Sequence, residues 1–169
     1  HKGQKKSWDH FDSLAKYIEE LGYLPLALPS PHEVEEVRVS CPSARILEPT
    51  TLGTYAALCE RASLVIANDS GISHVAAGIG ARQITLIGVT DPTRTGPWNP
   101  AAVTLGSEGH WPTEEEVKNT VHRILTTEAY SLLRFIPTSP CSQNSFISVF
   151  IPNIRLRTVS SGLTPPSSR

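Results

Sequence analysis

Apolar residues are arranged along this chain in two patterns, helical spacing and short continuous runs. From Trp8 to Leu21 the apolar residues recur at helical spacing, and the pattern stops at Gly22, which predicts a helix of about four turns. Short apolar runs predict strands, and these runs are YLPLAL, ARIL, LVIA, QITLI and AAVTL. Segments with helical character lie between or after the runs, at residues 32–38, 51–62, 71–79 and 113–125.

Strands that alternate with helices in this way predict an α/β fold. The expected architecture is a Rossmann-like parallel sheet with helices on both faces. In such sheets, ligands bind outside the carboxyl ends of the strands. Residues 68–71 follow the run LVIA and residues 88–97 follow QITLI, so we expect both loops at the same edge of the sheet.

The turn at residues 68–71 has the composition of an anion site. A helix that begins at Asp69 or Ser70 presents unpaired backbone N–H groups and the positive end of its dipole. Gly71 would let a ligand oxygen come close, and Ser70 and His74 could donate hydrogen bonds to the same anion. Asp69 would repel a phosphate, so we interpret it as a helix cap or as an acceptor for sugar hydroxyls.

A purely structural interpretation of these residues stays open at this point. Asp-Ser-Gly before a helix is ordinary capping chemistry, and His74 could be a surface histidine. The second loop favours a ligand site, because Thr90, Thr93, Arg94 and Thr95 would add donors and a positive charge at the same edge. The alternative for that loop is a proline-broken turn with a solvated Arg94.

Composition narrows the class of protein. The chain has 169 residues, of which 39% are hydrophobic and 18% charged, as is usual for a soluble globular domain. No apolar run approaches the ~20 residues that cross a bilayer, and the N-terminus does not resemble a signal peptide. Cys41, Cys59 and Cys141 are too far apart to indicate a disulfide framework or a zinc site, which favours a cytoplasmic setting.

The last forty-one residues differ in composition from the rest of the chain. All sixteen acidic residues lie at or before Glu128, and residues 137–169 hold five prolines and eight serines with one apolar patch, FISVFI. We therefore predict a single domain at residues 1–128 and a disordered tail at residues 129–169. The four arginines of that tail are too sparse for a nucleic-acid surface. Because the sequence contains no methionine, we expect a fragment or a processed piece.

The stretch LVIANDSGISHVAAGIGARQITLIGVTDP resembles the signature of glycosyltransferase family 9, the ADP-heptose:lipopolysaccharide heptosyltransferases. In that family an Asp-Ser/Thr-Gly-x-x-His turn precedes an alanine-rich helix, a strand and a Gly-x-Thr-x-Pro loop. KKSWDHF resembles the family's Lys-x-Trp-Pro segment, with Asp9 in place of proline, and TTLGTYAALCERASLVIANDSG resembles the helix and strand before the turn. The resemblance extends from His1 to about Leu125.

This resemblance implies the C-terminal, donor-binding domain of a two-domain GT-B enzyme. Such enzymes transfer a heptose from an ADP-sugar donor to the lipopolysaccharide core, with inversion and without a cofactor or an obligatory metal. Carried over by motif, the residues that bind the donor diphosphate would be Lys6, Ser70, Gly71 and His74. Asp69 would hold the donor sugar, and Thr90 and Arg94 would line the pocket. Lys6 could instead be one of several solvated lysines near the N-terminus.

Two departures from the family limit this expectation. The family's general base belongs to the N-terminal domain, which also contacts the acceptor, so we expect no catalytic residue in this chain. The first strand of the C-terminal domain, normally central, is also missing, and its absence would leave neighbouring strands without partners. We therefore predict that the chain alone binds nucleotide poorly and transfers no sugar. Peripheral association with the inner membrane is an expectation from the family.

The same residues allow two alternatives to a transferase, a binding module and a hydrolase. A non-catalytic module that binds a nucleotide or another anion would use the same turn, because a fold alone does not dictate chemistry. A hydrolase built on Ser73, His74 and Asp69 is disfavoured, because GISHV lacks the second glycine of the nucleophile elbow.

Overall fold

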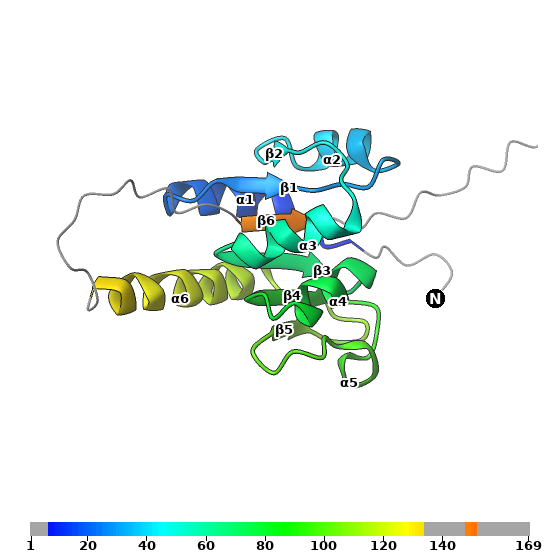
Figure 1. Ribbon diagram of the computed structural model, residues 1–169. Helices are drawn as coiled ribbons and strands as arrows, with labels where there is room; N and C mark the ends of the chain where they lie inside the picture. Colours follow the sequence, from blue (N-terminus) through cyan, green and yellow to red (C-terminus); the bar gives the residue numbers. More distant parts are fainter. Residues whose placement is uncertain (1–6, 134–147, 152–169) are drawn as a thin grey trace, which may run out of the picture.

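The structure of the chain is a computed structural model that describes residues 7–133 and 148–151 (Figure 1). Its strands are β1 (Pro25–Ala27), β2 (Arg45–Ile46), β3 (Leu64–Asn68), β4 (Gln83–Ile87), β5 (Val103–Gly106) and β6 (Ser148–Ile151). Its helices are α1 (Phe11–Glu20), α2 (Val34–Ser40), α3 (Leu52–Arg61), α4 (Gly71–Gly78), α5 (Pro92–Thr95) and α6 (Glu114–Leu133). The expected alternation of strands and helices is therefore present.

The six strands form one parallel sheet in the order β2-β1-β6-β3-β4-β5. Side chains from β3 enter a separate apolar core on each face. Leu64 and Ile66 pack with residues of α1 and α6, whereas Val65 and Ala67 pack with residues of α3 and α4. Burial on both faces explains why this strand is continuously apolar rather than alternating. The predicted α/β class, with helices on both faces, is confirmed.

Two predicted helix caps are present. The hydroxyl of Thr51 accepts a hydrogen bond from the Thr54 N–H at 3.2 Å, and that of Thr113 accepts one from the Glu116 N–H at 3.2 Å. The first helix, however, begins at Phe11 rather than near Trp8. Trp8 is buried, and its indole N–H donates to the Pro112 carbonyl at 2.8 Å, so its burial reflects docking ahead of the helix.

The apolar patch in the predicted tail forms β6, a strand that the sequence analysis did not predict. β6 lies in the middle of the sheet, where Val149 is paired with Leu26 of β1 on one side and with Val65 of β3 on the other (Figure 1). The strand expected to be missing therefore has its place taken by a segment from the other end of the chain. The physical reason is that the facing edges of β1 and β3 offer unpaired N–H and C=O groups, which a parallel strand between them satisfies.

The predicted boundary at residue 128 falls inside α6, which continues to Leu133. The rest of the predicted tail, at residues 134–147 and 152–169, lies outside the described residues, as does Cys141. None of the helices within residues 7–133 combines the length and the apolar character that a membrane span needs.

Candidate functional site

The two loops singled out in the sequence lie at the same edge of the sheet. β3 and β4 are parallel neighbours in which Asn68 is paired with Leu86, so the chain leaves both strands on the same side. β6 ends there as well, because Ile151 is paired with Ala67. The site can therefore be built from the turn after β3 and the loop after β4, as the sequence predicts.

Asp69 contacts three parts of the chain at this edge. Its N–H donates to the Leu86 carbonyl at 3.1 Å, which extends the ladder between β3 and β4. Its Oδ2 atom accepts hydrogen bonds from Thr90 Oγ1 at 2.5 Å and from Thr95 Oγ1 at 2.8 Å. Its Oδ1 atom lies 3.7 Å from Nε2 of His74, one turn into α4. One carboxylate thus joins the end of β3, the first turn of α4 and the loop after β4.

The N-cap of α4 is Ser70, not Asp69. The N–H of Ser70 donates to Ser73 Oγ at 3.2 Å, and that hydroxyl donates back to the Ser70 carbonyl at 2.7 Å. Oγ of Ser70 is buried and faces the N–H of Ser73 in a capping box, although no contact of this oxygen within the described parts of the chain meets full hydrogen-bond geometry. Gly71 is exposed, and a side chain added there would project into open space. The start of α4 therefore combines amides without intrahelical acceptors, the buried hydroxyl of the cap and room for a ligand beside Gly71.

His74 stands beside this helix start with 43% of its side chain exposed, whereas the Asp69 side chain is 10% exposed. A ligand that approached the first turn of α4 would therefore meet the imidazole before the carboxylate. The predicted donors Ser70, Gly71 and His74 share one turn, and Thr90 reaches that turn through Asp69.

The other residues predicted for the site, Arg94, Thr93 and Lys6, have no described contact with the start of α4. Arg94 is exposed on α5. Asp91 caps the start of α5, where its Oδ1 accepts from the N–H and the hydroxyl of Thr93 at 2.9 and 2.7 Å. These hydrogen bonds hold the pKa of Asp91 below its usual value. Lys6 lies outside the described residues, but the N–H of Trp8 donates to Asn68 Oδ1 at 3.3 Å, so the N-terminal segment reaches the end of β3.

A cavity of about 270 Å³ next to the first turn of α4 was missed in the sequence analysis. It is lined by Leu28, Pro29, Ser30, Pro31, Glu33, Thr50, Leu52, Tyr55 and Ile72. Glu33 is almost fully buried, and its Oε2 atom accepts from the N–H of Ser30 at 3.0 Å. Burial raises the pKa of the Tyr55 hydroxyl far above its usual range, so this wall of the cavity is uncharged. The signal that could have found the cavity is the proline-rich loop after YLPLAL, which leaves the sheet at the same edge.

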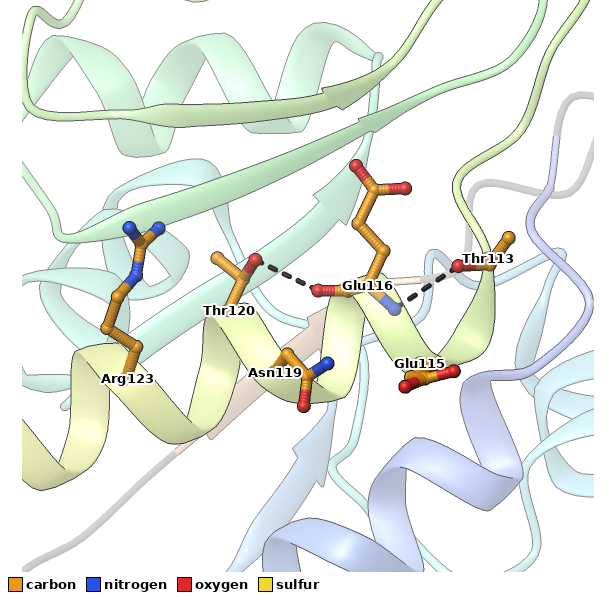
Figure 2. Close-up of a pocket in the computed structure, with 6 residues that line it drawn as sticks. All are labelled: Thr113, Glu115, Glu116, Asn119, Thr120 and Arg123. Atoms are coloured by element: carbon orange, nitrogen blue, oxygen red, sulfur yellow. Dashed lines mark hydrogen bonds between the residues drawn. The ribbon is translucent and has the colours of Figure 1, made fainter.

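A larger and more open hollow of about 550 Å³ lies along α6 (Figure 2). Its lining residues are Thr113, Glu115, Glu116, Asn119, Thr120 and Arg123. Both threonine hydroxyls in this lining form hydrogen bonds with the backbone of Glu116. Thr113 Oγ1 accepts from the Glu116 N–H, and Thr120 Oγ1 donates to the Glu116 carbonyl. None of the residues predicted for the site lines this hollow, so the start of α4 remains the candidate.

The two cysteines among the described residues are buried. Cys41 and Cys59 are buried free thiols, and burial raises the pKa of each to about 11, which leaves them protonated and unreactive. Within residues 7–133 and 148–151, no group of three or more His, Cys, Asp or Glu side chains is placed to hold a metal ion.

Comparison with known proteins gives a family match and several similar structures. The family model described as Glycosyltransferase family 9 (heptosyltransferase) matches residues 1–124. Among solved structures, the chain is similar to E. coli ADP-heptose lps heptosyltransferase II, with 25% identity and a TM-score of 0.63 over 73% of this chain and 43% of that one. No curated protein matches the chain.

Two further solved structures share the fold. One is the glycosyl transferase family 9 protein from Veillonella parvula DSM 2008, with 24% identity and a TM-score of 0.56 over 80% of this chain and 44% of that one. The other is E. coli heptosyltransferase WaaC with ADP, with 21% identity and a TM-score of 0.57 over 75% of this chain and 42% of that one. The chain thus spans less than half the length of each of these proteins.

Proposed function

Because this chain belongs to glycosyltransferase family 9 (heptosyltransferase), we propose that it is the donor-binding part of a sugar transferase. The observation that carries the proposal is the open start of α4, where the motif Asp-Ser-Gly-x-x-His of the matched segment places amide, hydroxyl and imidazole donors together. These groups suit the diphosphate of a nucleotide-sugar donor. Ser70, Gly71 and His74 are the proposed diphosphate ligands, and Lys6 is a further candidate.

The nucleoside is proposed to occupy the 270 Å³ cavity. Ile72 belongs both to the lining of this cavity and to the first turn of α4, so a base in the cavity would lie beside a diphosphate at the helix start. Leu28, Leu52 and Ile72 offer apolar contact to a base. An ADP-sugar is the proposed donor, since one similar structure is an ADP-heptose heptosyltransferase and another is WaaC with ADP.

The proposed reaction is transfer of a heptose from ADP-heptose to a lipopolysaccharide core acceptor, with inversion and without an obligatory metal. As the glycosidic bond breaks, negative charge grows on the departing diphosphate. Fixed amides at the start of α4, together with His74 and Lys6, would stabilise that charge as it forms. The general base and the acceptor contacts are assigned to a part of the relatives that this chain does not span.

The second candidate is a non-catalytic nucleotide-binding module. The start of α4 is compatible with it as well, because amides and an imidazole can bind an anion without any transfer reaction. Both candidates require nucleotide binding, and only the first requires sugar transfer once an upstream domain is supplied. The test incubates a version of this protein extended upstream with ADP-heptose and a lipopolysaccharide core acceptor, and mass spectrometry then measures the acceptor. A gain of one heptose in the acceptor's mass supports the transferase, and an unchanged mass supports the binding module.

Nucleotide binding is tested by calorimetric titration of the full chain with ADP and with adenosine. We expect ADP to bind more tightly than adenosine, and we expect His74→Ala to weaken ADP about tenfold while leaving adenosine unchanged, since only ADP carries the diphosphate. His122→Ala, a histidine on α6, is the matched control. A chain that binds ADP no better than adenosine would contradict the proposal.

The sequence predicts that the chain alone binds nucleotide poorly, because backbone groups at the centre of the sheet would be left unpaired. In the structure, β6 pairs with both neighbouring strands there, so this reason no longer applies. Titration of the chain and of the upstream-extended version with ADP compares the two directly. Weaker binding by the chain alone would then point to ligands supplied by the added segment rather than to an incomplete sheet.

A further inference from the structure

We infer that Asp69 is a positioning residue that ties the loop after β4 to the start of α4 and so fixes the shape of the anion site. This role differs from direct contact with the donor sugar, and it rests on the proposed function of that site. The evidence is the arrangement of three chain segments around one carboxylate. Thr90 and Thr95 lie 21 and 26 residues away from Asp69 in sequence, and both donate to its Oδ2 atom.

The two threonines hold both ends of the segment that contains α5. Thr90 precedes α5, and Thr95 is its last residue. Thr95 has one hydroxyl proton and two acceptors in reach, of which Asp69 Oδ2 at 2.8 Å is closer than the Asp91 carbonyl at 3.1 Å. Removal of either hydroxyl would therefore release one end of the segment from the helix start.

The segment between the two threonines is compact, so we expect it to move as one unit when a hydrogen bond to Asp69 is lost. Asp91 caps α5 through Thr93, and the N–H of Gly96 donates to the Pro92 carbonyl at 2.9 Å. A Cβ atom at Gly96 would lie 2.5 Å from that carbonyl oxygen, so the turn is closely packed. The bonds to Asp69 thus set the position of a preformed turn rather than its internal shape.

Burial separates the role of Asp69 from that of its neighbours. With 10% of its side chain exposed and Oδ2 occupied by two hydroxyls, Asp69 offers a ligand little free surface. His74 and Gly71 are the exposed members of the same turn. We therefore expect Asp69 to influence the donor through the groups that it positions.

The test is a double-mutant cycle in the full chain, read by ADP titration with adenosine as the reference ligand. Thr95→Val removes the hydroxyl at nearly constant volume and should weaken ADP about fivefold, whereas Thr95→Ser should restore binding to within about twofold. Asp69→Ala should weaken ADP about tenfold. Because both changes break the same bond, the double variant should bind like Asp69→Ala alone, and adenosine affinity should not change.

Three results would overturn the inference alone while leaving the proposed function in place. They are unchanged ADP binding by Thr95→Val, failure of Thr95→Ser to restore binding, and multiplied losses of about fiftyfold in the double variant. If Thr95→Val does not fold, Thr90→Val and Thr90→Ser repeat the comparison at the other end of the segment. Absence of ADP binding by both the unsubstituted chain and the version extended upstream would overturn the proposed function, and this inference with it.

Discussion

Gly71 illustrates how a single residue can separate stability from binding. It lies in the first turn of α4 with open space where a side chain would project, and its backbone is in a conformation that other residues adopt. A methyl group there would meet none of the residues that the structure describes, but it would occupy the space proposed for a phosphate. The fold therefore does not require glycine at this position, whereas the proposed ligand does.

Gly71→Ala is accordingly expected to leave the free energy of unfolding unchanged or to raise it by up to about 1 kcal/mol, because alanine favours helix. ADP affinity should fall about tenfold. Urea denaturation and ADP titration measure the two effects separately. Gly78→Ala, at the far end of the same helix and also facing open space, should show the gain in stability without the loss of affinity. A Gly71→Ala variant with full ADP affinity would argue against a phosphate at this turn.

Sequence patterns predicted the individual residues of the turn but not the bonds among them. Asp-Ser-Gly before a helix is a local signal, and so it could be found by inspection. The bond from Thr95 to Asp69 spans 26 residues and depends on how two neighbouring strands deliver their loops. For the same reason the wall of the 270 Å³ cavity was missed, since Leu28, Thr50 and Ile72 come from three separate segments.

At the scale of elements, α1 and α6 are held together by a cluster of charged and polar side chains around Glu114. Lys118 Nζ lies 2.6 Å from Glu114 Oε1, His10 Nδ1 lies 3.3 Å from Oε2, and the hydroxyl of Ser13 donates to the same carboxylate. The hydrogen bond from Lys118 is the main cause of a lowered pKa for Glu114, with further contributions from Ser13 and His10.

This lowered pKa has a defined consequence for stability against pH. The ionised carboxylate is favoured in the folded state, so its contribution is present above the ordinary value of 4.5 and is lost as the pH falls through the lowered value. Glu114→Gln should therefore make the free energy of unfolding depend less steeply on pH below about 5, as measured by urea denaturation at several pH values. Glu115→Gln, an exposed neighbour in the same turn, is the control. Equal slopes for wild type and Glu114→Gln would contradict the assignment.

On the scale of the whole molecule, the sheet is two halves joined by β6. β1 and β2 form one half and β3, β4 and β5 the other, and β6 is paired with both. Strands such as LVIA and QITLI were predictable because burial on both faces makes them continuously apolar. β6 was not, because its proline- and serine-rich surroundings indicate disorder, while its position is decided by strand edges more than eighty residues away in sequence.

A proline in β6 tests this organisation. Phe150 is paired with Ala27 on one side and Ile66 on the other, so Phe150→Pro removes a ladder hydrogen bond from the centre of the sheet. We expect a loss of about 3 kcal/mol or more in the free energy of unfolding, with faster amide exchange in β1 and β3. Leu52→Pro places the same residue at the first position of α3, where proline is tolerated, and should change stability little. An unchanged stability for Phe150→Pro would show that β6 does not join the two halves.

The position of β6 also bears on how the protein is made. Ribosomes deliver the chain from its N-terminus, so β1 and β3 emerge long before residues 148–151, and the last strand of the described sheet must enter between two elements that are already outside the exit tunnel. Contacts between such distant segments form slowly, because the entropy of closing the long intervening stretch is lost first. Until then the nascent chain exposes two unfilled strand edges, which makes this interval the period of greatest risk for aggregation and of greatest demand for chaperones.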